Sequence, residues 1–375
     1  MAAAITPLVM PKWGLEMREG TVAAWLVDEG TRIEVGTPIL DVETDKISNA
    51  VEAPDAGLLR RRVAREGETL PVKALLGVLA EAQVSDADID AYIAAFEVPA
   101  AGDDEAGEAA AFEFVEVDGL RVRVARRGPP HGTPVLLLHG FGGDLGNWLF
   151  NLDALAERRP VLALDLPGHG QSTPRLPGTS LAALAGFVAH LLDRLDIQRV
   201  HAVGHSLGGA IAMQLALAHP ARVASLALIN SAGLGEEIDR GYIEGFVGAA
   251  SRRELKPVVE RLFADPSLVS RQLLDDLLQT KRLDGVTELL DALGRAQFGG
   301  GRQAESPGRA LDTKARPTLV LWGRDDRVIP ATHATQAPAG STVEVLDGAG
   351  HMLMMEKASE VNARLRRHLD AAEGS

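Results

Sequence analysis

The first 80 residues follow the short, alternating hydrophobic pattern of β-strands. Apolar and β-branched runs are separated by glycine, proline and aspartate in the segments GTVAAWLVDEG, TPILDVET, ISNAVEAP and GLLRRRVAREG. Runs of this kind, bounded by turn-forming residues, are typical of strands joined by tight turns. The pattern therefore predicts an all-β domain over residues 1–80.

A short helix and a linker are expected next, over residues 81–111. The segment SDADIDAYIAAFE begins with a Ser/Asp cap and places Ile89, Tyr92, Ile93 and Phe96 at helical spacing. Such a helix could dock on a neighbouring element. The following segment, EVPAAGDDEAGEAAA, is rich in alanine, glycine and acidic residues and has almost nothing to bury. It predicts a mobile linker between two independent domains.

After the linker, apolar runs alternate with helical segments over residues 112–375. The runs PVLLLHG, PVLALDLPGHG, RVHAVGH, RVASLALINSAG and PTLVLWGRDD indicate buried strands, whereas SLAALAGFVAHLLDRL and LGGAIAMQLALAHP have helical periodicity. This alternation predicts a parallel α/β sheet. Between about residues 234 and 316 the strands stop, and RRELKPVVERLF and RQLLDDLLQTKRL are helical in pattern. We expect an inserted helical cap there.

Composition and charge narrow the class of protein. A chain of 375 residues favours two or more domains, and its 46% hydrophobic content is ample for a large core. It contains no cysteine, which excludes disulfides and thiolate metal sites, and no motif requires a metal. A formal net charge of -14 argues against non-specific nucleic-acid binding. Neither a signal-peptide pattern nor a run of roughly 18 apolar residues is present, so we expect a cytoplasmic protein with no membrane association.

Lys46 lies between two strand-like runs, TPILDVET and ISNAVEAP, at the tip of a predicted hairpin whose turn suits Asp45. A lysine in such a turn is presented to solvent, and by itself it would be interpreted as an ordinary surface residue. Two alternative amines, Lys12 and Lys73, lie before a Trp-Gly turn and near the final strand. We interpret both as structural or surface residues.

The surroundings of Lys46 change this interpretation. Gly30 lies sixteen residues before Lys46 and Gly57 eleven residues after it, with VMPKWGLEMREGTV upstream and LPVKALLGVL downstream. With these features, residues 5–80 resemble the lipoyl domains of 2-oxo-acid dehydrogenase complexes. The resemblance implies a flattened pair of β-sheets and a lipoate attached to Lys46 by a lipoate ligase or lipoyl transferase. Biotin carriers are the close structural rival, but their lysine lies in an AMKM-like sequence, whereas this chain has TDKI.

Ser206 is the candidate nucleophile. It lies in the segment GHSLG, which follows the apolar strand RVHAV and precedes the helix LGGAIAMQLALAHP. This is the context of a nucleophile elbow, in which small residues flank a strained turn that exposes the serine hydroxyl. The pentapeptide alone is a weak signal, since such a turn could also pack tightly or bind phosphate at the helix N-terminus. Two later segments strengthen it, because LVLWGRDDRVIP ends a strand with two aspartates and LDGAGHMLMMEK supplies a histidine.

Residues 112–375 therefore resemble the α/β-hydrolase family, and the resemblance implies a catalytic triad. Ser206 falls on the nucleophile position, and His351 falls on the histidine of a G-H pair near the C-terminus. The W-G-x-x-D pattern of the family ends on Asp326, which is the expected acid, with Asp325 as the alternative.

The segment LLLHGFGGD resembles the oxyanion loop of the same family. The resemblance implies that the backbone N–H groups of Phe141 and Leu207 hold the anionic oxygen of a tetrahedral intermediate. Glu356 follows His351, as a glutamate often does in the family. Four other histidines are interpreted as structural: His139 and His205 shape the turns beside the site, His169 lies in a family-like loop, and His219 ends a helix.

The two halves together point to acyl transfer. Lipoyl domains normally precede a catalytic domain with an HxxxDG motif, but the Asp-Gly pairs of this chain are preceded at that position by Phe114, Thr280 and Val343. A lipoyl domain joined to an α/β-hydrolase domain resembles instead the acyltransferase components of acetoin dehydrogenase complexes. The resemblance implies that thiamine-diphosphate-dependent acetoin dehydrogenase subunits acetylate the lipoyl group on Lys46 and that coenzyme A receives the acetyl group. It also implies a dihydrolipoyl dehydrogenase partner and a homo-oligomer.

The expected mechanism is ping-pong acyl transfer. Ser206 attacks the thioester with His351 as base and Asp326 orienting it, and coenzyme A then attacks the acetyl-serine. Two alternatives stay open: a lipoyl-tethered hydrolase acting as a thioesterase or carbon–carbon hydrolase, and a non-catalytic carrier whose second domain is an assembly scaffold. The products distinguish the three hypotheses, as acetyl-coenzyme A, free acetate or neither.

Overall fold

The computed structural model describes residues 5–11, 13, 17–44, 48–98, 112–314 and 316–374. The chain divides into two compact units, Met1–Ala109 and Ala110–Ser375. Each unit has its own sheets and its own buried core. None of the helices in the described ranges has the length and apolar character needed to span a bilayer.

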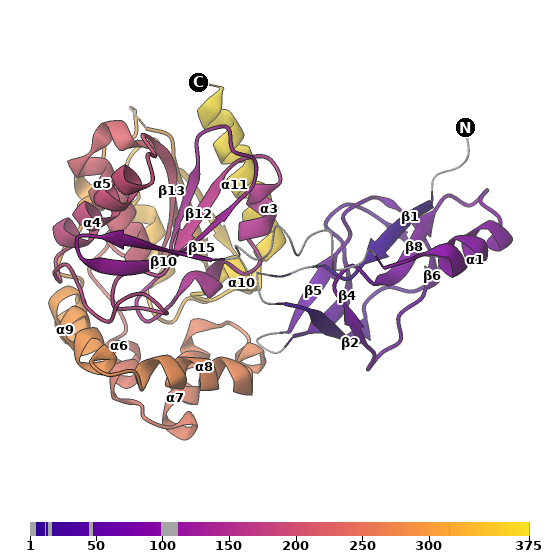
Figure 1. Cartoon of the computed structure of the whole chain (residues 1–375), viewed down its shortest axis with the longest axis horizontal. Coiled ribbons are helices and arrows are strands. Elements are labelled where there is room, and N and C mark those ends of the chain that lie inside the picture. Colours follow the sequence, from indigo (N-terminus) through magenta and orange to yellow (C-terminus); the bar gives the residue numbers. More distant parts are fainter. Residues whose placement is uncertain are drawn as a thin grey trace. The chain divides into compact units, whose positions relative to one another are not determined.

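The N-terminal unit is a sandwich of two four-stranded antiparallel sheets (Figure 1). One sheet has the strand order β1-β8-β6-β3 and the other β5-β4-β2-β7. The all-β fold expected from the alternating pattern is confirmed. The strands are β1 (Ile5–Val9), β2 (Glu19–Trp25), β3 (Arg32–Ile33), β4 (Pro38–Glu43), β5 (Ser48–Glu52), β6 (Gly57–Arg62), β7 (Thr69–Pro71) and β8 (Leu75–Ala80).

The sandwich is held together by side chains that the strands turn into the space between the sheets. Val22 of β2, Leu40 and Val42 of β4, Leu59 of β6 and Leu76 of β8 are all fully buried in one cluster. Burying an aliphatic side chain of this size stabilises a fold by about 1.5–3 kcal/mol. The alternation of apolar and polar residues in the sequence therefore predicts which face of each strand packs in the core.

The β4–β5 hairpin carries the segment around Lys46. Its antiparallel ladder ends with Glu43 opposite Ser48, so four residues connect the two strands. Lys46 is one of these four and lies outside the described residues, as does Lys12. Lys73 lies in the turn before β8, with a positive φ of 69°. The pairing of the two strands is that of the predicted hairpin.

Helix α1 (Asp86–Ala95) packs on the sheet that contains β8. Ser85 caps its first turn, and Ile89 is fully buried in a cluster with Val78 of β8. The predicted helix is therefore present and docks on the β-sandwich. The linker expected after it lies outside the described residues from position 99 to position 111.

The C-terminal unit is built on an eight-stranded sheet with the order β16-β15-β14-β13-β11-β12-β10-β9. Strands β11 to β16 pair in parallel, which confirms the predicted α/β class. Helices α4 and α5 lie over one face of the sheet, and α3 and α11 lie over the other (Figure 1). The elements are β9 (Glu113–Val117), β10 (Leu120–Arg127), β11 (Val135–Leu138), α3 (Leu152–Ala156), β12 (Val161–Leu164), α4 (Leu181–Arg194), β13 (Val200–His205), α5 (Leu207–Ala218), β14 (Val223–Ile229), β15 (Thr318–Gly323), β16 (Thr342–Leu346), α10 (Leu353–Glu356) and α11 (Ala358–Glu373).

One edge of this sheet differs from the parallel expectation. β9 and β10 form an antiparallel hairpin, and β10 also pairs antiparallel with β12. The turn residues Asp118 and Gly119 have φ values of 52° and 72°, which is the left-handed conformation that a two-residue hairpin turn requires. The Asp-Gly pair is thus the local cause of the β9–β10 hairpin.

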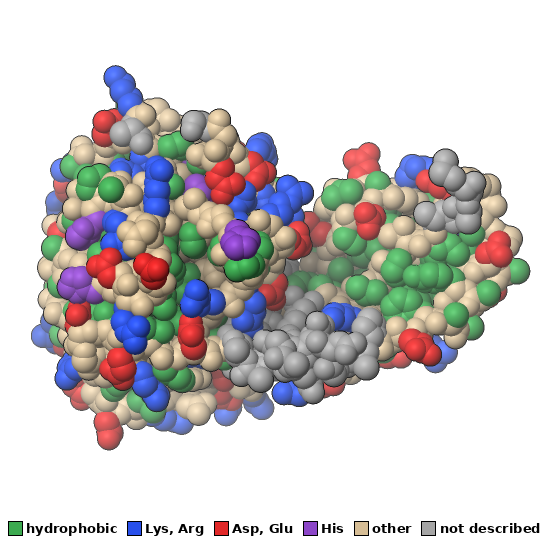
Figure 2. All heavy atoms as spheres, turned by 45° about the horizontal axis from the view of Figure 1, so that its top comes forward, with side chains coloured by type: hydrophobic (Ala, Val, Ile, Leu, Met, Phe, Trp, Pro, Cys, Tyr) green, Lys and Arg blue, Asp and Glu red, His purple; other side chains and the backbone are tan. Residues whose placement is uncertain are grey.

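The surface of the C-terminal unit carries charges of both signs. Figure 2 shows acidic and basic side chains interspersed over the face in view. Several form exposed ion pairs, such as Arg302 with Glu236 and Arg324 with Asp347. Exposed pairs of this kind contribute about 0–1 kcal/mol each. The stability of the unit therefore comes from its buried strands and helices rather than from these pairs.

A helical cap is inserted between β14 and β15, as the sequence predicted. Side chains cap the first turns of three of its helices, Asp239 for α6, Ser251 for α7 and Ser270 for α8. The four helices lie together on one side of the C-terminal unit (Figure 1). They are α6 (Arg240–Gly248), α7 (Arg252–Val259), α8 (Arg271–Lys281) and α9 (Val286–Phe298).

A buried lysine from α8 caps the C-terminal end of α6. The Nζ of Lys281 donates hydrogen bonds to the carbonyl oxygens of Val247 at 3.1 Å and Ala249 at 2.7 Å, and also to that of Phe246. Carbonyls at a helix C-terminus lack helical partners, and a cation is favoured beside them. Burial lowers the pKa of Lys281 to about 8. The contact fastens α8 to α6.

We expect Ile89→Ala to detach α1 from the sandwich. Ile89 is fully buried, and truncating a buried isoleucine to alanine costs about 2–5 kcal/mol. A helix of 10 residues is too short to persist alone. Hydrogen–deuterium exchange should show the amides of α1 exchanging like those of an unfolded peptide while β8 stays protected. The exposed substitution Ala94→Ser is the control, and unchanged protection of α1 in Ile89→Ala would contradict the docking.

Candidate active site

The carboxyl ends of parallel strands bring the predicted site residues to one edge of the sheet. Phe141 follows β11, Ser206 follows β13, Asp326 follows β15 and His351 follows β16. Because the strands run in the same direction, their carboxyl ends meet at a common edge. The sheet therefore gathers residues that are far apart in the sequence.

Ser206 occupies a strained turn between β13 and α5. Its φ of 52° and ψ of -120° lie in a region that residues with a side chain rarely adopt. Backbone hydrogen bonds hold the turn: the amide of Ser206 donates to the carbonyl of Ile229 at 3.1 Å, and its carbonyl accepts from the amide of Ala232 at 3.0 Å. The segment that follows β14 thus fixes the conformation of the serine.

The glycines on either side of Ser206 are required by close backbone approach. A Cβ at Gly204 would lie 2.4 Å from the carbonyl oxygen of Gly208, and a Cβ at Gly208 would lie 2.1 Å from the carbonyl oxygen of Leu138. Backbone atoms cannot move aside as a flexible side chain could. The G-x-S-x-G spacing therefore reflects the packing of the start of α5 against β11.

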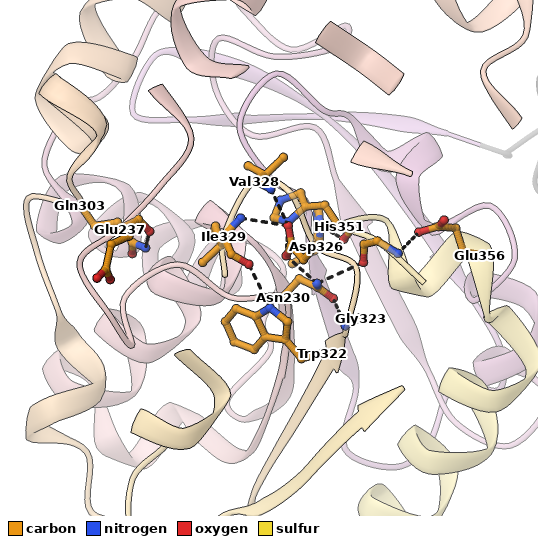
Figure 3. Close-up of polar contacts among 12 residues, drawn as sticks. Asn230, Glu237, Gln303, Trp322, Gly323, Asp326, Val328, Ile329, His351 and Glu356 are labelled. Carbon is orange, nitrogen blue, oxygen red and sulfur yellow. Dashed lines mark hydrogen bonds and ion pairs between the residues drawn. The ribbon is translucent and has the colours of Figure 1, made fainter. Parts of the chain in front are cut away.

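Asp326 is the carboxylate that pairs with His351. The Nδ1–H of His351 donates to Oδ2 of Asp326 at 2.8 Å, and both side chains are buried. The other oxygen of Asp326 accepts hydrogen bonds from the amides of Val328 at 2.8 Å and Ile329 at 2.9 Å (Figure 3). Asp325, the alternative acid, is an exposed residue. The geometry thus favours Asp326 as the group that orients the imidazole.

Asn230 belongs to the site although no sequence motif indicated it. It lies directly after β14, is fully buried and has a φ of 43°. Its Nδ2 donates to Oδ2 of Asp326 at 2.7 Å and to the carbonyl of Gly350 at 3.2 Å (Figure 3). Its Oδ1 accepts from the amide of Gly323 at 3.4 Å. One side chain therefore links the turn of the acid to the turn of the histidine.

His205 holds the backbone of His351. Its Nε2–H donates to the carbonyl oxygen of His351 at 2.9 Å, and the two rings lie 4.7 Å apart. Burial lowers the pKa of His205 well below its usual value, and the neighbouring His351 lowers it further. The ring is therefore neutral at pH 7, with its proton committed to a carbonyl. This arrangement suits positioning of His351 rather than proton exchange with a substrate.

Leu207 directly follows Ser206, and Phe141 lies in the loop after β11 that approaches Ser206. Leu207 is the first residue of α5, where the helix dipole favours negative charge. Gly140, which precedes Phe141, approaches Ser206 so closely that a Cβ there would lie 2.9 Å from the Cβ of the serine. Within the described ranges, neither amide donates to a backbone carbonyl. Two amides without backbone partners are what the predicted oxyanion hole needs.

Two buried side chains brace the loop between β11 and α3. Asp165 accepts a hydrogen bond at Oδ1 from the amide of Leu145 at 2.8 Å. His139 donates from Nδ1 to the carbonyl of Gly140 at 2.8 Å and accepts at Nε2 from the amide of Leu166 at 2.9 Å. Burial raises the pKa of Asp165 to about 7 and lowers the pKa of His139 to about 4. His139 is therefore a neutral ring whose two nitrogens shape the loop.

The two remaining histidines named from the sequence occupy structural positions. The Nδ1–H of His169 donates to the carbonyl of Pro167 at 3.1 Å, and burial lowers the pKa of His169 to about 3. His219 is the C-terminal cap of α5, and its amide donates to the carbonyl of Leu215 at 2.8 Å. No cluster of histidine and carboxylate side chains in the described ranges could hold a metal ion.

The cap contacts the oxyanion loop through aromatic rings. The ring of Phe141 lies 6.1 Å from that of Phe246 in α6 and 6.0 Å from that of Phe298 in α9. A Cβ at Gly142 would lie 2.4 Å from the ring of Phe246, and a Cβ at Gly294 would lie 3.3 Å from the ring of Phe141. The cap is thus packed closely on the loop that contains Phe141.

Comparison with family models agrees with the two-unit architecture. Residues 133–358 match the model described as alpha/beta hydrolase fold. Residues 6–79 match the biotin/lipoyl model, which is described as Biotin-requiring enzyme.

Two curated relatives match along almost the whole chain. The dihydrolipoyllysine-residue acetyltransferase component of the acetoin cleaving system of Cupriavidus necator is 64% identical over 368 residues, which cover 97% of each chain. The protein of the same description from Pseudomonas putida is 50% identical over 370 residues, covering 97% of this chain and 99% of the relative. Among solved structures, a meta-cleavage product hydrolase of Pseudomonas fluorescens matches with a TM-score of 0.62 at 23% identity, over 69% of this chain and 98% of that chain. That likeness concerns the fold alone.

We expect His139 to make the C-terminal unit less stable as the pH falls. The pKa of His139 is about 4 in the folded chain, against 6.5 for an ordinary histidine, so the unfolded chain binds the proton first. Between these two pH values the free energy of unfolding should fall by about 1.4 kcal/mol per pH unit from this residue. Asp165, whose pKa is raised, acts in the opposite direction, so the test must compare two proteins.

The measurement is urea unfolding of the full-length chain over this pH range, followed by the helical circular-dichroism signal. The variant His139→Asn has no titrating side chain at position 139. Its unfolding free energy should therefore depend less steeply on pH than that of the unchanged protein. Parallel pH dependences for the two proteins would contradict the assignment.

Proposed function

This chain belongs to the family of dihydrolipoyllysine-residue acetyltransferase components of acetoin cleaving systems, and we propose that it moves an acetyl group from a lipoyl group on Lys46 to coenzyme A by way of Ser206. One observation carries the proposal: a β-sandwich of the biotin/lipoyl type is joined to a unit in which Ser206, Asp326 and His351 share one sheet edge. Both relatives align over nearly their full length, so they share this pairing of domains.

Lipoate on Lys46 would supply a dithiolane. Reductive acetylation by the partner enzyme would open this ring and leave one sulfur carrying the acetyl group as a thioester. The hairpin supports this position, because its ladder ends with Glu43 opposite Ser48 and leaves Lys46 in a four-residue connection. An amine in a short connection between antiparallel strands is accessible to a lipoate ligase or lipoyl transferase.

In the first half-reaction, Ser206 is the nucleophile. Its Oγ attacks the carbonyl carbon of the acetyl thioester, and the Nε2 of His351 accepts the hydroxyl proton. Asp326, bonded to the opposite nitrogen at 2.8 Å, orients the ring and stabilises its positive charge. The amides of Phe141 and Leu207 stabilise the anionic oxygen of the tetrahedral intermediate. Its collapse gives acetyl-Ser206 and a thiolate, which takes the proton from His351.

In the second half-reaction, the thiol of coenzyme A attacks the acetyl-serine. His351 removes the thiol proton and returns it to the Oγ of Ser206, which releases acetyl-coenzyme A. Water could attack in the same way and give acetate. We therefore assign to the cap, through its contacts from Phe246 and Phe298 to the oxyanion loop, the role of limiting water at the acetyl-serine.

The activity requires other proteins, because both relatives are described as components of a system. We propose thiamine-diphosphate-dependent acetoin dehydrogenase subunits as the donor of the acetyl group. A dihydrolipoyl dehydrogenase would reoxidise the dithiol that remains after transfer. We also propose that the chain works as a homo-oligomer in the cytoplasm.

We expect Lys46 to be the only lipoylation site. Intact-mass spectrometry after co-expression with a lipoate ligase should show a single lipoyl addition. The variant Lys46→Arg should lack it, because a guanidinium group does not form the amide. Lys73→Arg, which changes a lysine in another turn of the same unit, is the matched control and should keep the addition. Lipoylation that persists in Lys46→Arg would refute the assignment.

We expect Ser206→Ala to lower the rate of acetyl transfer to coenzyme A by several orders of magnitude. Reductive acetylation of the lipoyl group on Lys46 by the partner enzyme should stay intact. Because triad members act as a unit, adding His351→Ala should cost little more than either change alone. Asp326→Asn should be damaging, whereas the matched control Asp325→Asn should be mild. With coenzyme A withheld, a radiolabelled acetyl group should be trapped on Ser206.

Product analysis separates this function from its rivals. The unchanged protein should form acetyl-coenzyme A, whereas a tethered thioesterase would release acetate and a non-catalytic carrier would form neither. Near-normal acetyl-coenzyme A formation by Ser206→Ala would mean direct attack of the coenzyme thiol on the lipoyl thioester, and the covalent mechanism would be abandoned.

A further inference from the structure

A short cap segment lies against the turn that carries His351. This docking segment, residues 262–264, starts at the last residue of the 3-10 helix Glu260–Leu262 and ends shortly before the 3-10 helix Pro266–Leu268. The carbonyl oxygen of Leu262 accepts a hydrogen bond from the amide of Met352 at 3.0 Å. On the other side of His351, a Cβ at Gly350 would lie 2.7 Å from the amide nitrogen of Ala264. The docking segment therefore contacts both neighbours of the histidine.

Glu356 joins the docking segment to the histidine turn through a single carboxylate. Its Oε2 accepts from the amide of Gly350 at 2.7 Å (Figure 3), and its Oε1 accepts from the amide of Ala264 at 2.6 Å. Burial raises the pKa of Glu356, and these amide hydrogen bonds oppose the rise. A carboxylate held between two amides is a charge-assisted bridge. Its two ends lie in the cap and beside the general base.

Arg327 extends the same connection to the turn of the acid. It follows Asp326 in the sequence, and its Nη2 donates to the carbonyls of Phe263 at 2.7 Å and Ala264 at 3.3 Å. The side chain of Phe263 is itself buried. The docking segment is thus bonded to the turns of both His351 and Asp326, which follow separate strands of the sheet.

We propose that the cap holds the general base in place, and that Glu356 is the positioning residue through which it does so. The proposal deepens the function given above and rests on it. The docking segment binds the loop of His351 directly at Met352 and through Glu356 at Gly350, in addition to the bonds that Asn230 and His205 make to the same loop. In this proposal the imidazole and Ser206 are fully in register only while the docking segment is seated. A cap displaced to admit a thioester or coenzyme A would therefore lower the base activity of His351 at the moment when water has access.

The test compares Glu356→Gln and Glu356→Ala with the unchanged full-length protein. Glutamine keeps one acceptor for the two amides and alanine keeps none, so the effect should grow in that order. Since a displacement of about 1 Å at a catalytic group can cost about 100-fold in rate, we expect kcat for acetyl-coenzyme A formation to fall by about 10- to 100-fold in Glu356→Ala. The KM for coenzyme A should stay within about twofold, because no contact with the substrate is removed.

A second readout does not depend on the proposed activity. In nitrogen-labelled protein, the Nδ1 proton of His351 should give a downfield NMR signal while it is bound to Asp326. Loss of the bridge should broaden or remove this signal through exchange with water. If the unchanged protein forms no acetyl-coenzyme A, the proposed function fails and this signal alone decides the positioning role.

Arg252→Ala is the matched control. It breaks an ion pair between α7 and α8, from Arg252 to Asp275, within the same cap but without contact to the docking segment. It should leave both kcat and the Nδ1 signal unchanged. An equal loss in Arg252→Ala would show general loosening of the cap, and an unchanged kcat and Nδ1 signal in Glu356→Ala would show that His351 is set without the cap. Either result overturns the proposal.

Discussion

The backbone strain at Ser206 is the constraint on which the C-terminal unit depends. A residue with a φ of 52° costs about 1–3 kcal/mol and relaxes unless its surroundings prevent it. Here the carbonyl of Ile229 and the amide of Ala232 hold the turn. The close approach of Gly208 to Leu138 leaves no space for the turn to adopt a different backbone conformation. The pairing of β11, β13 and β14 is thus also what keeps the serine hydroxyl at the edge of the sheet.

The acid is fixed in the same redundant way. The two oxygens of Asp326 accept hydrogen bonds from the amides of Val328 and Ile329, from Asn230 and from His351. A carboxylate with every direction occupied cannot rotate to follow the imidazole, so the imidazole must follow it. In the proposed mechanism, the dipoles that would stabilise a charged His351 are therefore oriented by folding, and little reorganisation would be left for the reaction itself.

The sequence predicted the features that depend on residues close together in the chain. It did not predict contacts between residues that are far apart in the chain. Ser206 and Asp326 lie in patterns whose spacing reflects a tight local turn, and strand and helix periods revealed the order of the elements. Asn230 acts on an aspartate 96 residues away, and Glu356 binds Ala264 across 92 residues, so no local pattern encodes either contact. The antiparallel edge was not predicted for a different reason. The turn between β9 and β10 has a local sequence signal, but the pairing of β10 with β12 depends on residues far along the chain. Periodicity predicts which side chains are buried. Only the folded sheet shows which residues those side chains pack against.

The lysine that caps α6 has a chemical consequence in a chain that handles activated acetyl groups. Thioesters acylate neutral amines, and a pKa of about 8 leaves part of the Lys281 population neutral near pH 7. Its Nζ is nevertheless committed to three carbonyls in the interior of the cap, and so no acyl donor reaches it while α6 and α8 stay packed. An acetyl group on Lys281 would accumulate only in molecules whose cap had come apart, and the modification would be a covalent record of how often that happens.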